Sequence, residues 1–212
     1  MNYYRGTYEN IISRISNDKI ETLDVHHRLI KKFYHMYRDL KKEEKIFNQM
    51  NLGPMCKETF NFLIERMFIE HDEGKANIDF QYLLGNSELR NRFYSKKHSK
   101  LGSILFWNKY IDIVLNANFS VDEKLILVKF LNIICFIINI HHINRDYELD
   151  YIKRLYCEYV AILQTESMYK LDLLKINKKV KLDFNQIVNY ALPLLKRCDK
   201  EAAKYFKMNG GL

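Results

Sequence analysis

The segment Leu125–Ile140 reads LILVKFLNIICFIINI and is followed at once by His141 and His142. Apolar residues occupy nearly every position around its helical circumference, a pattern that predicts a helix buried on all sides. At roughly 16 residues, and with Lys129 and Asn132 inside it, the segment is shorter than the roughly 20 residues of a membrane span. We therefore expect a central core helix that delivers two imidazoles to the edge of the core.

Apolar residues recur every three or four positions along most of the chain, as at Leu29 and Phe33. This spacing defines one face of a helix, and sustained two-residue alternation is absent, so the sequence predicts an all-α fold, a multi-helix bundle. The expected helices cover 7–16, 22–48, 57–71, 78–85, 87–97, 101–117, 121–140, 146–165 and 184–206. Ser120 and Glu123 form a capping-box pattern at the start of one of them, and Pro193 is expected to kink or restart the last.

The composition suggests one domain over residues 1–212. The chain has 212 residues, of which 48% are hydrophobic, and only seven glycines and two prolines, so no linker is evident. The N-terminus lacks the apolar core of a signal peptide. Four scattered cysteines, without a CxxC pair, fit a reducing cytoplasm and buried or neutral thiols rather than a zinc site. These are Cys56, Cys135, Cys157 and Cys198.

A formal charge of +8 and a pI near 9.1 favour a polyanionic partner, because lysine and arginine displace counterions from phosphates. The densest basic cluster also contains aromatic residues, Phe93 and Tyr94, on which the bases of a single strand could stack. An ordinary solvated helix face is the alternative. The candidate DNA-binding residues are Arg90, Arg92, Lys96, Lys97 and Lys100.

Histidines and aspartates occur in a particular order along the chain. Taken singly, a histidine at a helix end is more often hydrogen-bonded or solvated than a metal ligand. The series is nevertheless specific, because an HDxGK pattern arises by chance in on the order of one chain in a thousand. Its members are His26, His71-Asp72 with Gly74-Lys75, Phe80-Gln81, His98-Ser99 with Leu101-Gly102, His141-His142 and Asp199.

This series resembles the HD phosphohydrolase superfamily, and more narrowly the HD nuclease domain of type I CRISPR systems. The resemblance spans about residues 23 to 205, and its most distinctive part is HDEGKANIDFQYLL followed by KKHSKLGS. It implies an all-α scaffold, two divalent metal ions and cleavage of single-stranded DNA. It also implies recruitment by a helicase and an RNA-guided surveillance complex. The chain contains no GxxxxGK[ST] loop, so we expect a separate helicase chain, or a longer protein of which this chain is a fragment.

The resemblance also implies how the ligands divide between two metals, with Asp72 bridging them. The first metal would be held by His26, His71, Asp72 and Asp199, and the second by Asp72, His98, His141 and His142. For the first histidine, His27 is an alternative, although the Leu-x-x-His spacing from Leu23 favours His26. For the last carboxylate, Asp183 competes with Asp199, although Asp183 has the position of an N-cap before Phe184.

The expected chemistry needs an activated water and stabilisation of charge on the phosphate oxygens, both of which two divalent ions provide. Imidazole and carboxylate ligands suit Mn, Fe, Co, Ni or Zn better than they suit Mg. Asp72, as the bridging ligand, and Lys75, close to the scissile phosphate, are the expected catalytic residues. Lys75 in a solvated turn is the simpler alternative.

Two other functions fit the same pattern. One is an HD phosphohydrolase acting on nucleotides or cyclic nucleotides, against which the positive charge argues mildly. The other is a basic helical module that binds nucleic acid or a partner without turnover. Loss of cleavage on chelation separates an enzyme from such a module.

Overall fold

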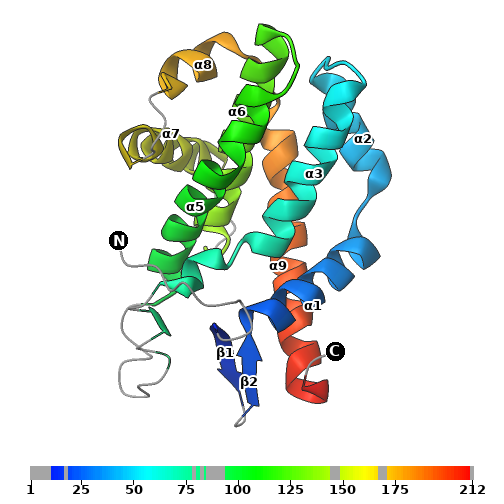
Figure 1. Ribbon diagram of the computed structural model, residues 1–212, viewed down its shortest axis with the longest axis vertical. Coiled ribbons are helices and arrows are strands. Elements are labelled where there is room, and N and C mark those ends of the chain that lie inside the picture. The colour runs from blue at the N-terminus through cyan, green and yellow to red at the C-terminus, as the bar shows by residue number, and fades with distance from the viewer. Residues whose placement is uncertain are drawn as a thin grey trace.

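The protein is described by a computed structural model (Figure 1). The structure describes residues 11–16, 19–77, 80, 81, 84, 94–143, 149–166 and 171–210. Over these residues it is mostly helical, with one two-stranded antiparallel sheet. The all-α prediction is therefore confirmed at the level of fold class. Within the described chain, none of the helices combines the length and the apolar character needed to cross a bilayer.

The elements follow one another in a simple order. They are β1 (Ile12–Ser16), β2 (Lys19–Thr22), α1 (Leu23–Tyr37), α2 (Leu40–Gln49), α3 (Met55–Glu70), the 3-10 turn η2 (Glu73–Ala76), α5 (Tyr94–Asn116), α6 (Val121–Ile140), α7 (Leu149–Glu166), α8 (Leu173–Lys179) and α9 (Phe184–Asn209).

Helix α6 forms the centre of the core, as its sequence predicts. Almost every residue from Leu127 to Ile140 is buried, and α6 packs along α5 and also contacts α3, α7, α8 and α9 (Figure 1). Its one buried lysine, Lys129, donates to the backbone oxygens of Asn177 and Val180 at the end of α8. A cation at a helix C-terminus satisfies carbonyls that have no partner inside the helix. The buried charge thus binds α8 to the core.

The start of α6 confirms the predicted capping box. Ser120 Oγ accepts a hydrogen bond from the Glu123 backbone, and the Glu123 carboxylate accepts one from the Ser120 backbone. The same carboxylate also accepts a hydrogen bond from the Gly53 backbone at 3.1 Å. Glu123 therefore joins the start of α6 to the turn before α3, in addition to capping its own helix.

Several predicted boundaries were wrong. The expected helix 7–16 is a strand over Ile12–Ser16, because its β-branched residues pair with β2. The expected helix 22–48 is divided into α1 and α2, because Arg38 is extended and Asp39 caps α2 by accepting from the Lys42 backbone. Helix α5 runs unbroken through the expected gap at 98–100, and α8 was not predicted.

Other helices agree closely with the prediction. Helices α3, α6, α7 and α9 begin and end within a few residues of the expected positions, and α9 continues through Pro193 without restarting. The expected helices 78–85 and 87–97 fall largely outside the described residues. One cluster of buried apolar side chains has members from all eight α-helices of the described chain.

The Glu123 contacts predict a change of stability with pH. Hydrogen bonds from the Ser120 backbone and side chain, then from Gly53, lower the pKa of Glu123 from 4.5 to about 2. A lowered pKa means that this contribution is present above pH 4.5 and is lost as the pH falls towards 2. We expect Glu123→Gln to lower the melting temperature at neutral pH and to flatten its decline below pH 4.5. Glu158→Gln, at an exposed position on α7, is the control; parallel curves for both variants would contradict the assignment.

Candidate metal centre

The centre is built around Asp72, at the junction of α3 and η2. The apolar residues Leu63, Met67 and Phe68 are fully buried and fix the end of α3 in the core. His71 and Asp72 follow directly, and both side chains are almost completely inaccessible to solvent. The chain therefore carries an acidic residue into the interior at the point where the helix ends.

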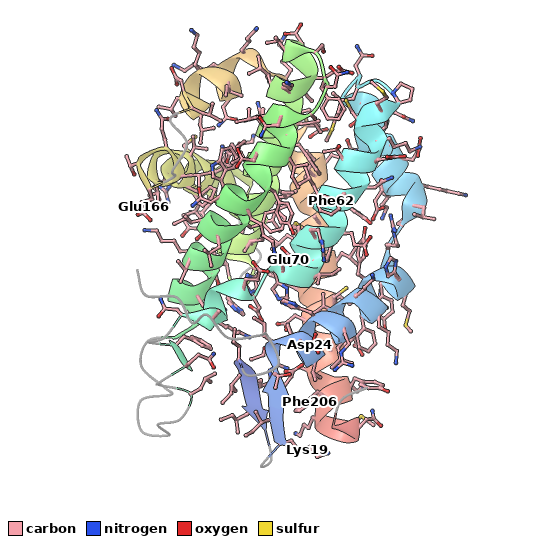
Figure 2. The ribbon with its side chains drawn as sticks, viewed as in Figure 1. Lys19, Asp24, Phe62, Glu70, Glu166 and Phe206 are labelled. Carbon is pink, nitrogen blue, oxygen red and sulfur yellow. The ribbon has the colours of Figure 1, made fainter. Side chains whose placement is uncertain are left out.

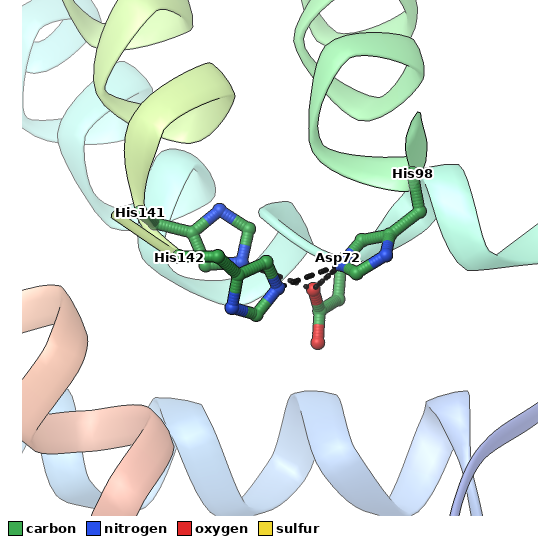
Figure 3. A group of neighbouring side chains, drawn as sticks. All are labelled: Asp72, His98, His141 and His142. Carbon is green, nitrogen blue, oxygen red and sulfur yellow. Dashed lines mark hydrogen bonds and ion pairs between the residues drawn. The ribbon is translucent and has the colours of Figure 1, made fainter. Parts of the chain in front are cut away.

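The two oxygens of the Asp72 carboxylate face different histidines. Oδ1 lies 3.4 Å from Nε2 of His98 and 3.4 Å from Nε2 of His141, and Figure 3 shows these rings converging on the carboxylate. Oδ2 lies 3.3 Å from Nε2 of His26 and 3.6 Å from Nε2 of His71. One carboxylate thus stands between two sets of imidazoles.

Two groups of four side chains result, and they share Asp72. Within each group, one ligand atom from every residue lies within 4.8 Å of the others. The first group is His26, His71, Asp72 and Asp199, and the second is Asp72, His98, His141 and His142. The structure therefore brings together all seven residues that the sequence singled out as metal ligands, in the two expected sets.

Neither alternative residue takes part in these groups. His27 is buried beside His26 but belongs to neither set. Asp183 caps α9, where its Oδ1 accepts a hydrogen bond from the Gln186 backbone at 3.0 Å. Asp199, sixteen residues further along the same helix by the residue numbers, lies with Oδ1 3.8 Å from His26 Nε2.

Hydrogen bonds determine which ring nitrogen of two histidines faces Asp72. His71 Nδ1 donates to the Phe68 carbonyl at 2.8 Å, and His141 Nδ1 donates to the Ile138 carbonyl at 2.6 Å. A carbonyl oxygen only accepts, so Nδ1 carries the proton in both rings. In the neutral ring, Nε2 is then left with its lone pair directed at the centre, as a metal ligand requires.

The charge states of the centre suit cation binding. Burial lowers the pKa of His71 to about 3 and that of His142 to about 2, which keeps both rings neutral near pH 7. Burial opposes ionisation of Asp72, but Lys75 and the surrounding histidines hold its pKa well below the usual range. The centre therefore offers the neutral imidazoles of His71 and His142 beside an ionised carboxylate.

The donor set fits a divalent transition-metal ion in each group. Within the described part of the chain, the buried Nε2 atoms of His26, His71 and His141 make no hydrogen bond. Buried polar atoms usually have partners, so such atoms directed at one point require an explanation, and a bound ion supplies one. Mixed imidazole and carboxylate donors favour Mn, Fe, Co, Ni or Zn.

Lys75 lies inside the centre rather than in a solvated turn. Its side chain is 7% exposed, and Nζ lies 2.5 Å from Asp72 Oδ2 and 3.3 Å from Ser13 Oγ. The ammonium thus neutralises the carboxylate shared by the two groups. Contact with a phosphate would require it to leave this position or to reach past it.

Glycine is needed where η2 meets the first turns of α5. A Cβ at Gly74 would collide with the His98 carbonyl oxygen and lie 2.6 Å from the Gly102 backbone nitrogen. A Cβ at Gly102 would lie 3.1 Å from the His71 carbonyl oxygen. These two glycines therefore allow the backbone carrying His71 and Asp72 to approach the helix carrying His98.

Phe80 and Gln81 support the same junction. The Phe80 ring packs edge-on against His98, with ring centroids 5.2 Å apart. Gln81 exchanges two hydrogen bonds of 2.8 Å with the backbone of Ile12 and donates a third to the Lys75 carbonyl. The side-chain amide thus connects β1 to η2 and has a structural role.

Most of the predicted DNA-binding cluster cannot be placed. Arg90 and Arg92 lie outside the described residues, as do the side chains of Lys96 and Lys97 at the start of α5. Lys100 is described, and its Nζ lies 2.7 Å from a Glu166 carboxylate oxygen at the end of α7. Both partners are substantially exposed, so Lys100 is accessible.

Sequence reasoning missed two residues that contact the centre. Glu21 Oε1 lies 3.1 Å from Nδ1 of His26, and Arg14 Nη2 lies 3.2 Å from Oδ1 of Asp199. Both residues belong to the β1–β2 hairpin; Arg14 lies where the helix 7–16 was expected, and Glu21 lies between the expected helices 7–16 and 22–48. The available signal was β-branched residues on both sides of Asn17 and Asp18, which are common turn residues.

No protein-family model, no curated protein and no solved structure matches this chain.

Because η2 and α5 approach closely at Gly74, adding one methyl group there should lower the stability of the fold. We expect Gly74→Ala to lower the free energy of unfolding by about 1–3 kcal/mol, because the new Cβ meets backbone that cannot move freely. Gly102→Ala should cost less, since its nearest contact is 3.1 Å. Urea unfolding of both variants measures the difference. Equal stability of Gly74→Ala and the parent chain would show that η2 and α5 are not packed this closely.

Proposed function

We propose that this protein is a metal-dependent nuclease of the HD type that hydrolyses phosphodiester bonds in single-stranded DNA. The observation that carries the proposal is the shared carboxylate of Asp72, whose two oxygens face two separate sets of histidines. Two four-residue groups around one bridging ligand are the arrangement expected of a two-metal phosphodiester hydrolase.

The metal ions, when bound, supply an activated water and a positive charge that stabilises the phosphate and the leaving oxygen. The residues of the two groups would hold these ions. Asp72 would be a ligand of both ions, while His71 and His141 keep Nε2 directed inward through hydrogen bonds from Nδ1 to backbone carbonyls. Such bonds behind a ligand fix its ring orientation.

Lys75 adds a fixed positive charge beside the bridging carboxylate. Once cations occupy both groups, Asp72 would no longer depend on Lys75 for its charge balance. The ammonium would then be able to contact a phosphate oxygen, as the resemblance implies. Ser13 Oγ, 3.3 Å from Nζ, would hold the side chain near the centre during this change.

Charge and access support a polymeric substrate. The chain carries a net charge of +8, and the centre is partly exposed at Asp199, whose side chain is 24% exposed. A strand approaching this side would meet a positively charged protein, which increases association with phosphates. Recruitment by a helicase and an RNA-guided surveillance complex belongs to the same proposal, and rests on the resemblance to the CRISPR-associated domain.

Burial of the centre also fits a smaller substrate, a nucleotide or cyclic nucleotide. His26, His71, Asp72, His98 and His141 are all buried, and a small phosphodiester reaches such ligands more easily than a polymer does. The cleavage assay therefore includes a cyclic mononucleotide beside the labelled strand.

The decisive substitution is Asp72→Asn, which keeps the shape of the side chain and removes the shared charge. We expect single-strand cleavage with Mn, Co or Ni to fall by about 100-fold or more, because the metals contribute several kcal/mol to the barrier. Asp183→Asn is the matched control, since asparagine also caps helices and Asp183 lies outside the centre.

The outcomes separate the candidate functions. Metal-dependent strand cleavage that Asp72→Asn abolishes and Asp183→Asn retains supports the nuclease. Turnover of the cyclic mononucleotide alone would replace it with a small-substrate phosphohydrolase. DNA binding without any hydrolysis, unchanged by chelator, would indicate a non-catalytic binding module.

A further inference from the structure

The β1–β2 hairpin contacts the centre through a buried acid outside both groups of candidate ligands. Glu21 on β2 is fully buried, although carboxylates are seldom buried without a specific partner. Its Oε1 lies 3.1 Å from Nδ1 of His26, on the side of the ring away from Asp72. The carboxylate is thus directed at the ring nitrogen of His26 that faces away from Asp72.

The direct connection from β2 to α1 places Glu21 next to His26. β2 ends at Thr22, which caps α1 by accepting from the Val25 backbone at 3.4 Å, and α1 begins at the next residue. His26 lies in the first turns of α1, so its ring can turn back towards the end of the strand. The strand-to-helix junction therefore fixes Glu21 and His26 relative to each other.

Arg14 on β1 extends the contact to a second member of the same group. Its Nε lies 3.7 Å from Glu21 Oε2, and its Nη2 lies 3.2 Å from Asp199 Oδ1. The hairpin pairing brings Arg14 opposite Glu21. The hairpin therefore contacts both His26 and Asp199, two of the four side chains of the first group.

The groups that accept a hydrogen bond from Nδ1 of these histidines differ in chemical type. Behind His71 and His141, Nδ1 donates to a backbone carbonyl, whereas behind His26 the acceptor is a carboxylate. A carboxylate accepting from the remote ring nitrogen raises the electron density at the ligating nitrogen and fixes the ring orientation. A bond to a charged acceptor is also stronger than one to a neutral carbonyl.

We propose that Glu21 is a positioning residue for the first metal group, in which it holds the His26 ring with Nδ1 protonated and Nε2 directed at the ion. This inference rests on the proposed two-metal centre and deepens it. The hairpin is then part of the metal site. The role of Glu21 also distinguishes the two groups, because Glu21 contacts His26, which belongs to the first group and not to the second.

The test is metal binding to the full chain carrying Glu21→Gln. Glutamine keeps the shape and can still accept a hydrogen bond, but it lacks the charge. We expect manganese affinity at one of two sites to fall by about 10–100-fold, the usual effect of removing a partner behind a ligand. At a free manganese concentration about ten times the parent's dissociation constant for that site, its occupancy should fall from about nine-tenths to between about one-half and one-tenth.

Glu43→Gln is the matched control. Glu43 is buried like Glu21, but it accepts hydrogen bonds from Tyr34 and Tyr190 hydroxyls away from the centre. We expect this control to lower the melting temperature without changing the number of bound ions. A purely structural role for Glu21 would give the two variants the same behaviour.

A measurement on the parent chain requires no substitution. With diamagnetic zinc bound, long-range proton–nitrogen spectra should show His26 protonated at Nδ1 and metal-bound through Nε2. Binding through Nδ1, or unchanged metal affinity in Glu21→Gln beside a parent chain that binds two ions, would overturn the role of Glu21 alone. A parent chain that binds no ion would overturn the metal centre as well.

Discussion

Burial of the Asp72 carboxylate dictates which side chains must surround it. An isolated carboxylate in a protein interior is costly, so it persists only when cations or hydrogen-bond donors surround it. Here Lys75 lies 2.5 Å away and four imidazoles face the two oxygens. Residues from α1, η2, α5 and α6 must therefore meet at one point, and the helices are arranged so that they do.

Backbone packing makes that meeting possible. Gly74 and Gly102 let η2 lie directly against α5, which brings His98 towards Asp72. On the other side of the same junction, Glu70 at the end of α3 (Figure 2) accepts from Tyr110 at 2.6 Å and lies 3.0 Å from Lys109. The 3.0 Å contact between Lys109 and Glu73 extends this network to η2. The glycines and this polar network join the end of α3 and η2 to α5. The hairpin contacts α1 through Glu21 and His26, and it contacts α9 through Arg14 and Asp199.

Local sequence was enough to predict the helical class, the central helix α6 and its capping box, because apolar periodicity and capping are local properties. It also singled out the seven candidate ligands in order, through the resemblance of HDxGK and the later histidines to the HD phosphohydrolase series. The preference for Asp199 over Asp183 followed from local reasoning too, because an aspartate just before a helix is a familiar cap.

The packing of distant segments sets which oxygen of Asp72 faces which histidines, and it brings Lys75 into contact with the carboxylate in the interior. It also decided that residues 12–16 form a strand, and that Glu21 and Arg14 reach His26 and Asp199. Arg14 and Asp199 are 185 residues apart in the chain. Sequence periodicity reports which face of an element is buried, but it carries no information on the partner that a distant segment brings to that face.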